Sequence, residues 1–336
     1  MIKLHHMAML LVTLLWVNQA SAGLTVIAHR GASGYLPEHT LEAAALAFAQ
    51  EPDYIEQDVV LSKDNHPVVL HDIHLETVSD VESKYPQRAR KDGRFYAIDF
   101  TLAELKTLQV HERQKASGEP VFPARYQGST AQFTIATLSE HIELITQLNR
   151  GLGKNIGFYT EIKSPAWHRK QGKDISKVVL NTFSESGLSQ SDSRVFIQCF
   201  DFEEVKRIRN ELNYQGKLVL LTADNSWKES GTDYNQILSE QGIREVKAVA
   251  DGLGPWLGQL VDMNALAKGN VVPLPWLEKA KQAGLVVHPY TVRSDALPAN
   301  MTLSQLIGLL NTVLSVDGVF TDQVPDVRAI LDKPAS

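Results

Sequence analysis

Residues 28–40 read Ala-His-Arg-Gly-Ala-Ser-Gly-Tyr-Leu-Pro-Glu-His-Thr. An apolar, β-branched run precedes this stretch, and Thr40 can cap a helix over the apolar residues 41–50 that follow it. We therefore expect a strand that ends at His29 and Arg30, and a glycine-bounded loop that leads into a helix. Because ligands of α/β proteins bind at this edge of the sheet, an imidazole beside a guanidinium there indicates proton transfer next to an anion.

Extended apolar runs alternate with amphipathic segments along the rest of the chain. The expected strands are 24–29, 53–60, 156–162, 194–199, 217–222, 247–253, 285–291 and 317–321. The expected helices are 40–50, 138–149, 174–186, 201–212, 274–283, 302–314 and 324–332. This alternation predicts a parallel sheet. About eight such units over roughly 310 residues favour a closed α/β barrel of the TIM type, (β/α)₈, over a doubly wound open sheet.

The first 22 residues carry the features of a secretory signal peptide. Lys3 precedes an apolar stretch at 8–17, and the small residues 20–22 follow it. Because the apolar stretch is too short to span a bilayer, we expect cleavage after Ala22 and no stable membrane anchor afterwards. An uncleaved anchor is the alternative. The remainder, 23–336, is expected to form one barrel domain.

Composition limits the partners and the compartment. The chain has 336 residues and a formal net charge of −6 without a basic block, so nucleic acid is not expected as a partner. Cys199 is the only cysteine, which excludes an intrachain disulfide, and its apolar neighbours indicate a buried structural thiol. A signal peptide without disulfides suits a secreted protein of a bacterial periplasm or cell exterior.

One interval interrupts the regular alternation. The chain between Asp72 and Ile156 is longer than a single crossover requires. We expect its polar residues, at about 75–130, to form an insertion on the barrel rim after the second strand region.

Three carboxylates are expected at the carboxyl ends of two strands. Glu56 and Asp58 share one face of their strand because side chains alternate along it, and Glu161 and Lys163 share a face of another. Carboxylates inside a barrel need compensating cations, and hard divalent metals take such oxygen ligands. We expect a metal held by Glu56, Asp58 and Glu161, with Lys163 facing an anion. Ca²⁺ and Mg²⁺ both suit the site; a solvated polar edge or a lysine salt bridge is the alternative.

A second imidazole is expected near the first. Only about seven residues separate the second strand from the extended run that ends at His71, too few for a parallel crossover helix. His71 is therefore expected to return close to the carboxylates and to His29. Two imidazoles, a metal and the cations Arg30 and Lys163 suit phosphoryl transfer, in which one histidine takes a proton and the other protonates the leaving oxygen. The glycine loops of nucleotide enzymes and the nucleophile elbow of serine hydrolases are absent from the sequence.

Five segments together resemble the glycerophosphodiester phosphodiesterases, most closely their secreted periplasmic branch. In family order they are His29-Arg30-Gly31 with Pro37-Glu38-His39-Thr40, Ile55-Glu56-Gln57-Asp58-Val59, Val68-Val69-Leu70-His71-Asp72, Glu161-Ile162-Lys163 and Gly318-Val319-Phe320-Thr321-Asp322. The resemblance implies a metal-dependent phosphodiesterase barrel that hydrolyses glycerophosphodiesters, such as glycerophosphocholine, to an alcohol and sn-glycerol 3-phosphate.

The resemblance also implies a role for each candidate residue. His29 and His71 would carry the acid/base chemistry, and Arg30 and Lys163 would bind the phosphate. The metal of the three carboxylates would be Ca²⁺ in the secreted branch. Phe200 and Tyr290, at strand ends, can line a pocket for the glycerol carbons, or they are ordinary core aromatics. Two departures from the family pattern, Cys199 and Arg293, concern the alcohol side of that pocket.

Two other functions remain open at this point. A phospholipase that acts on intact lipid can use the same barrel chemistry, although the polar residues at 75–130 favour soluble substrates. A non-catalytic surface binding protein can keep the barrel without turnover, although the complete set of site residues argues against it.

Overall fold

A computed structural model describes residues 23–298 and 300–333 of the chain. The expected signal peptide, residues 1–22, lies outside these ranges. None of the helices within them combines the length and the apolar character needed to cross a bilayer.

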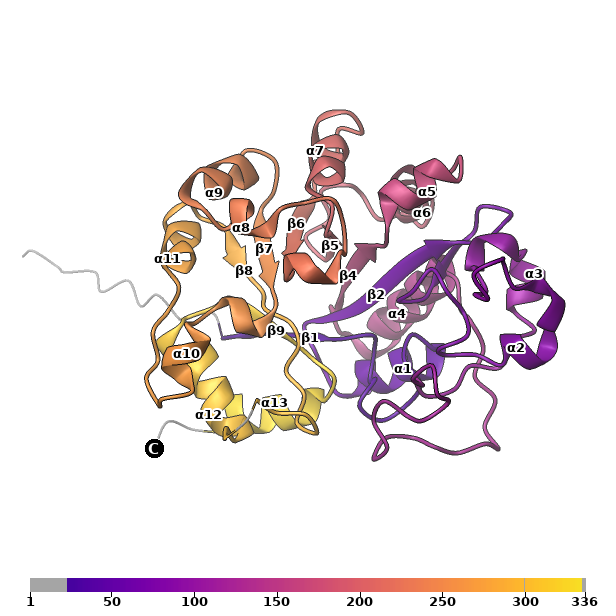
Figure 1. The fold of residues 1–336 in the computed structure, drawn as a ribbon, viewed down its shortest axis with the longest axis horizontal. Coiled ribbons are helices and arrows are strands. Elements are labelled where there is room, and N and C mark those ends of the chain that lie inside the picture. Colours follow the sequence, from indigo (N-terminus) through magenta and orange to yellow (C-terminus); the bar gives the residue numbers. More distant parts are fainter. Residues whose placement is uncertain (1–22, 299, 334–336) are drawn as a thin grey trace, which may run out of the picture.

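Eight parallel strands form the barrel at the centre of the molecule (Figure 1). They are β1 (Thr25–Ala28), β2 (Tyr54–Leu61), β4 (Gly157–Ile162), β5 (Val195–Cys199), β6 (Lys217–Thr222), β7 (Gly252–Pro255), β8 (Val286–Val287) and β9 (Gly318–Thr321). β9 pairs with β1, and the chain after β8 reaches β9, where the Phe320 amide donates to the Pro289 carbonyl at 3.0 Å. The expected (β/α)₈ barrel is confirmed, and the doubly wound open sheet is excluded.

Helices lie around the outside of the barrel (Figure 1). The longer ones are α1 (Leu41–Ala49), α4 (Leu138–Leu152), α6 (Ile175–Glu185), α7 (Phe202–Asn210), α9 (Glu240–Lys247), α11 (Pro275–Gln282) and α13 (Val324–Leu331). The shorter ones are α2 (Val81–Lys84), α3 (Leu102–Leu105), α5 (Pro165–Lys170), α8 (Tyr234–Ile237), α10 (Met263–Leu266) and α12 (Leu303–Gly308). Short 3₁₀ turns are η1 (Pro86–Arg88), η2 (Ala97–Asp99), η3 (Asn225–Trp227) and η4 (Leu257–Gln259), and a π turn, η5 (Leu309–Val313), continues α12. Thr40 caps α1 as expected, by accepting from the Ala43 amide.

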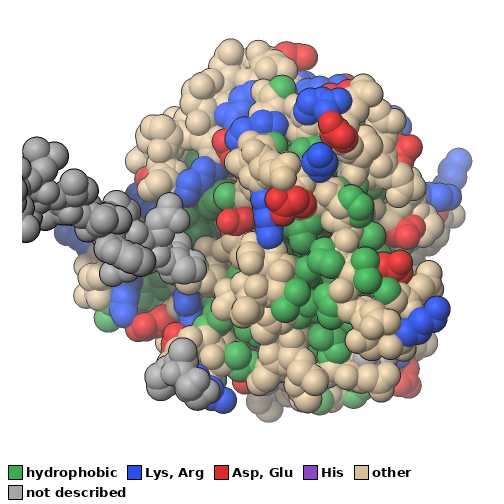
Figure 2. Space-filling view, turned by 90° about the vertical axis from the view of Figure 1, so that its left-hand side faces the viewer, with side chains coloured by type: hydrophobic (Ala, Val, Ile, Leu, Met, Phe, Trp, Pro, Cys, Tyr) green, Lys and Arg blue, Asp and Glu red, His purple; other side chains and the backbone are tan. Residues whose placement is uncertain are grey.

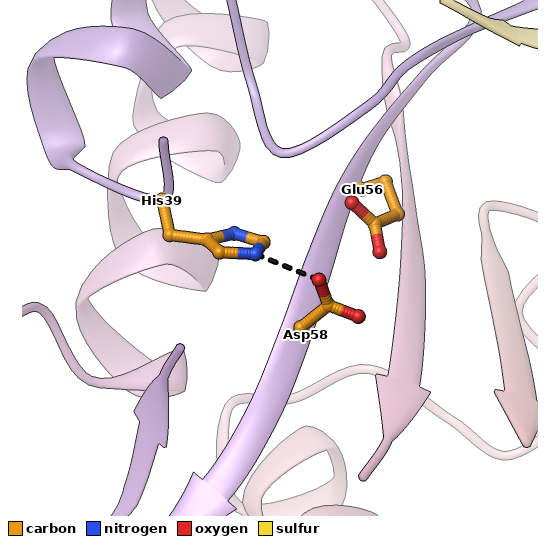
Figure 3. A group of neighbouring side chains, drawn as sticks. All are labelled: His39, Glu56 and Asp58. Carbon is orange, nitrogen blue, oxygen red and sulfur yellow. Dashed lines mark hydrogen bonds and ion pairs between the residues drawn. The ribbon is translucent and has the colours of Figure 1, made fainter. Parts of the chain in front are cut away.

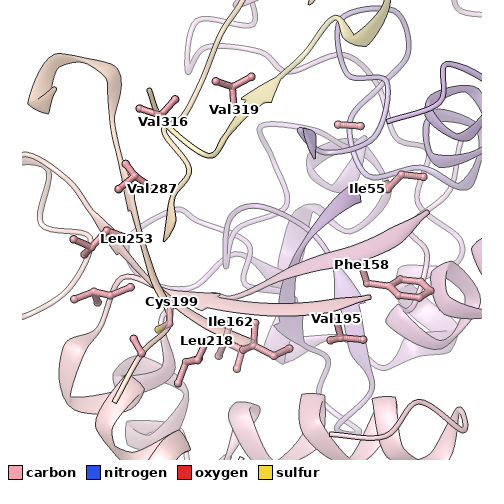
Figure 4. Close-up of a cluster of buried hydrophobic side chains, with 14 of the residues drawn as sticks. Ile55, Phe158, Ile162, Val195, Cys199, Leu218, Leu253, Val287, Val316 and Val319 are labelled. Atoms are coloured by element: carbon pink, nitrogen blue, oxygen red, sulfur yellow. The ribbon is translucent and has the colours of Figure 1, made fainter. Parts of the chain in front are cut away.

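Two hydrophobic layers hold the barrel together. The inner layer consists of Ile27, Tyr159, Phe196, Val219 and Phe320. The outer layer lies between the strands and the helices, and Figure 4 shows its side chains on successive strands, from Ile55 and Phe158 to Val319. Because side chains alternate along each strand, every strand can supply both layers. Glu56 and Asp58 take inward positions of β2, so the polar site lies on the same side of the sheet as the inner layer.

A short antiparallel strand, β3 (Pro67–Val69), follows β2 directly. Val69 lies opposite Val59, and the Leu70 amide donates to the Asp58 carbonyl at 2.9 Å. This pairing brings His71 back beside the carboxylates of β2, as the short connection predicts.

The chain between β3 and α4 lies at one side of the barrel and contains α2 and α3 (Figure 1). It has a hydrophobic cluster of its own, which includes Phe95, Phe100 and Leu108. Val60 of β2 and Val68 of β3 belong to the same cluster, so this rim segment is packed firmly onto the barrel.

Two expected strands were wrong in part, and two helices were not expected. The strand expected at 247–253 begins only at Gly252, because α9 continues to Lys247. The strand expected at 285–291 is reduced to β8, since the chain beyond it pairs with its neighbours only at isolated bridges. The helices α5 and α9 are absent from the sequence-based expectation, since α5 is short and α9 has little apolar surface.

Candidate active site

The loop after β1 delivers two polar side chains to the mouth of the barrel. Arg30 and Gly31 have left-handed backbone conformations, with φ angles of 58° and 78°. A Cβ on Gly31 would lie 2.9 Å from the carbonyl carbon of Ala43, so glycine lets the loop pack closely against α1. The Arg30 amide donates to Glu56 Oε2 at 2.7 Å, which ties the loop to β2 and holds His29 at the mouth.

His29 is oriented by a buried carboxylate. Its Nδ1 lies 2.6 Å from Asp322 Oδ1, an arrangement that places the imidazole proton on Nδ1 and leaves Nε2 as an acceptor. Arg30 Nε donates to that Nε2 at 3.2 Å. Burial and the Arg30 charge lower the pKa of His29 to about 4. The imidazole is therefore uncharged at neutral pH.

His71 has the same arrangement. Its Nδ1 lies 2.7 Å from Asp72 Oδ1, and its Nε2 lies 3.4 Å from Lys163 Nζ. Burial, together with the charges of Arg30 and Lys163, lowers the pKa of His71 to about 3. Each of the two imidazoles thus has a carboxylate on one nitrogen and a cation on the other.

Two arginines of the rim segment hold the carboxylates behind the histidines. Arg113 contacts Asp72 at 2.6 Å and also Glu38 at 2.6 Å, and Arg125 contacts Asp322 at 2.7 Å. Burial by itself would raise the pKa of Asp72 and Asp322, yet the neighbouring positive groups hold both well below the ordinary value. Sequence reasoning missed both arginines, because nothing local in the polar rim segment indicates what they contact.

Three buried carboxylates lie beside Lys163. Glu56, Asp58 and Glu161 are each at most 5% exposed, and Lys163 Nζ lies 2.7 Å from Glu161 Oε1 and 4.0 Å from Asp58 Oδ1. Burial and repulsion from Asp58 raise the pKa of Glu56 and Glu161 well above the ordinary value. The group has an excess of negative charge, which a hard divalent cation with oxygen ligands fits.

His39 joins this group from the loop before α1 (Figure 3). Its Nε2 lies 2.8 Å from Asp58 Oδ2, and one ligand atom each of His39, Glu56 and Asp58 lies within 4.8 Å of the others. Glu161, expected as the third ligand, contacts Lys163 and lies outside this compact trio. The sequence analysis did not name His39 as a ligand. The available signal was its place in the motif after β1.

The two histidines and the three carboxylates line one cavity of about 240 Å³. Phe200 and Tyr290 also line this cavity, with their rings edge to face and 5.9 Å between centroids. Lys163 lies behind the lining, with Nζ 5.5 Å from the Phe200 ring centre. Gln198 also lines the cavity, and its buried Oε1 has no hydrogen-bond partner among the described residues. Sequence reasoning missed Gln198, although its inward position on β5 follows from strand alternation.

Comparison with known proteins identifies the family. The model of the glycerophosphoryl diester phosphodiesterase family matches residues 29–326. The chain belongs to this family. A glycerophosphodiester phosphodiesterase of Haemophilus influenzae is 41% identical over 323 residues, which cover 91% of this chain and 89% of that protein. One of Treponema pallidum is 35% identical over 329 residues, which cover 92% of each.

A solved structure of the same fold supports the barrel. The phosphodiesterase of Oleispira antarctica, determined in complex with its product sn-glycerol-3-phosphate, has a TM-score of 0.63 and 21% identity. The alignment covers 93% of this chain and 98% of that one. The expected membership of the glycerophosphoryl diester phosphodiesterase family is confirmed, and so is the expectation of an enzyme. The narrower assignment to a secreted branch stays a prediction.

Proposed function

We propose that the enzyme hydrolyses small glycerophosphodiesters, such as glycerophosphocholine, to an alcohol and sn-glycerol 3-phosphate. The observation that carries this proposal is the pair of carboxylate-backed imidazoles, His29 and His71, which line one cavity together with Arg30. The names of the Haemophilus and Treponema relatives, and the product bound to the Oleispira enzyme, support the same reaction.

His29 and His71 are suited to move protons at the reacting oxygens. In the free site each Nε2 faces a cation and carries no proton, so either can take a proton from the attacking hydroxyl. A bound phosphodiester competes for Arg30 and Lys163 and favours the charged form of an imidazole. The other histidine can then supply the proton of the leaving oxygen. The nucleophile is water or the free glycerol hydroxyl beside the ester; the latter gives a cyclic phosphate that water opens.

We place a divalent cation, Ca²⁺ or alternatively Mg²⁺, among Glu56, Asp58 and Glu161, with His39 as a further ligand. When bound, such a cation withdraws negative charge from the phosphate oxygens. The support for it is the repulsion among buried carboxylates, which Arg30 offsets only in part at Glu56 and Lys163 only in part at Glu161.

Release of choline and glycerol 3-phosphate from glycerophosphocholine tests the activity. We expect equimolar release of the two products with Ca²⁺, loss of release in EDTA, and recovery when Ca²⁺ is added back. Full activity in excess EDTA contradicts the metal site. No release from any glycerophosphodiester contradicts the hydrolysis and favours the non-catalytic binding protein.

We also infer secretion, into a bacterial periplasm, from the signal-peptide pattern of residues 1–22. Amino-terminal sequencing of the protein from the periplasmic fraction should begin at Gly23. A protein recovered only from the cytosol with Met1 retained contradicts this inference.

A further inference from the structure

A second cavity lies beside the catalytic one. It measures about 340 Å³ and is formed by η4, α10, α12, η5 and the chain after β8. Its walls are mainly apolar and include Leu257, Leu260, Met263, Leu266, Leu306 and Leu310. No step of the proposed hydrolysis of small glycerophosphodiesters uses these residues.

The two cavities share a wall, because Trp227, Tyr290, Thr291 and Arg293 line both. The polar ends of two of these side chains are already engaged: the Tyr290 hydroxyl donates to the Thr222 carbonyl at 2.9 Å, and Arg293 Nε lies 2.8 Å from a carboxylate oxygen of Asp322. Apart from the guanidinium group of Arg293, the shared wall therefore offers mostly ring and aliphatic surface. One molecule can place its phosphate in the catalytic cavity and an apolar part in the second.

The apolar surface continues outward from the second cavity. Trp227 and Met263, at its mouth, and Val271 and Val272 nearby are between 42% and 49% exposed. Figure 2 shows hydrophobic side chains gathered on the face of the molecule that carries α10, α11 and α12. Exposed apolar surface of this kind marks binding sites for apolar ligands.

We propose that this cavity is a subsite for the single acyl chain of a monoacyl glycerophosphodiester, such as lysophosphatidylcholine. The inference rests on the proposed phosphodiesterase function and extends its substrate class. The chemistry is unchanged: water adds to phosphorus, the P–O bond to the head-group alcohol breaks, and a proton from water ends on the leaving oxygen. The products are the alcohol and the monoacylglycerol phosphate.

Choline release from glycerophosphocholine and from hexanoyl, octanoyl and decanoyl lysophosphatidylcholine, each below its micelle concentration, tests the subsite. We expect KM to fall with chain length, by up to about fourfold for each methylene group that becomes buried. Met263→Asp puts a charge at the mouth, and Leu266→Trp fills the interior. Both should lower the ratio of kcat/KM for the decanoyl substrate to that for glycerophosphocholine. Leu152→Asp, at a 62% exposed leucine of α4, is the matched control and should keep the ratio.

A binding experiment separates the subsite from the proposed activity. Tryptophan fluorescence should show tighter binding of decylphosphocholine than of hexylphosphocholine, and Met263→Asp should remove the difference. If no glycerophosphodiester is hydrolysed but this chain-length dependence is found, the proposed function fails and the subsite stands. If glycerophosphocholine is hydrolysed but neither KM nor binding depends on chain length, the subsite is overturned and the proposed function stands. Self-association of the protein through the patch, without any chain-length dependence, also overturns it.

Discussion

At the scale of single residues, the site keeps two imidazoles neutral by surrounding each with opposite charges. Asp322 and Asp72 hold the Nδ1 protons of His29 and His71, while cations face both Nε2 atoms. Burial adds to the effect of those cations, so both pKa values lie below neutrality. At neutral pH, such a site takes up a proton only when an anion enters it.

Removal of either imidazole tests its part in proton transfer. We expect His29→Ala and His71→Ala each to lower kcat for glycerophosphocholine by roughly 10²- to 10⁴-fold, because a positioned acid or base is lost. Melting temperatures of the variants report whether folding is retained. His66→Ala, at a histidine whose side chain is 51% exposed, is the control and should keep full activity. A variant that folds and retains turnover removes that histidine from the mechanism.

The buried carboxylates make a second prediction at this scale. Glu56→Gln removes one of the mutually repelling groups, so we expect the metal-free variant to melt at a higher temperature than the metal-free parent protein. The increase in melting temperature that Ca²⁺ produces in the parent should be reduced or absent in the variant. Glu51→Gln, at a glutamate whose side chain is 64% exposed, provides the comparison. Equal Ca²⁺ stabilisation of the parent and of Glu56→Gln contradicts the metal site.

At the scale of elements, the rim segment between β3 and α4 connects the two halves of the site. Arg113 reaches the carboxylate behind one histidine, and Arg125 reaches the carboxylate behind the other. The side chain of Arg125 is only 4% exposed, and its second contact is Asp295 of the loop after β8. The segment thus acts on the site through positioning, although neither arginine lines the catalytic cavity.

Substitution of these arginines tests that role. We expect Arg113→Ala and Arg125→Ala to lower kcat by roughly ten- to a hundredfold, the usual cost of losing an outer partner of a site residue. Loss of Arg125 also removes a positive group from Asp322, the carboxylate that raises the pKa of His29, so Asp322 should act more strongly on the imidazole and the pKa of His29 should rise from about 4. The acid limb of the kcat/KM profile should therefore move toward neutral pH. Arg88→Ala, which breaks the half-buried pair with Glu104 in the same segment, is the control.

If Arg113→Ala and Arg125→Ala only destabilised the fold, the result would be different. Destabilisation would lower the amount of folded enzyme and leave the shape of the pH profile unchanged. That outcome, in Arg125→Ala, would contradict the positioning role.

The elements show why local sequence was enough for some predictions and not for others. The return of β3 beside β2 follows from a short connection, which is a local property. The strand expected at 247–253 fails at its start because Val246, Val249 and Ala250 are buried by the end of α9 and the chain after it rather than by a strand. A short apolar run has the same composition in either structure, and only the neighbouring elements decide between them.

At the scale of the whole molecule, buried neutral histidines make the fold sensitive to acid. Burial lowers the pKa of His168 to about 4 and that of His288 to about 3. Because both values lie below that of an unfolded histidine, the unfolded chain binds more protons between pH 6.5 and 4. The stabilisation of the fold that depends on these neutral histidines is complete above pH 6.5 and is lost as the pH falls. Each histidine contributes on the order of 3 kcal/mol to this loss.

Denaturant unfolding at pH 7, 5.5 and 4.5 measures the effect. We expect the free energy of unfolding to fall steeply over this range. His168→Gln and His288→Gln should each reduce the number of protons taken up on unfolding by about one, because glutamine does not titrate. The free energy of unfolding of each variant should therefore fall less steeply with decreasing pH. His66→Gln, at an exposed position, should leave the slope unchanged. Slopes that are identical in all the variants contradict the assignment.

The sequence by itself determined the barrel, the inward faces of β2 and β4, and the return of His71 toward the acids. All of these follow from alternation along strands and from the lengths of connections, which are local properties. Only the tertiary structure decided which group stands behind each imidazole. Asp72 is the neighbour of His71, but Asp322 lies 293 residues from His29 and reaches it because β9 pairs with β1. The contacts of Arg113 and Arg125, and the apolar cavity beside the site, arise in the same way, from segments distant in sequence that packing brings together.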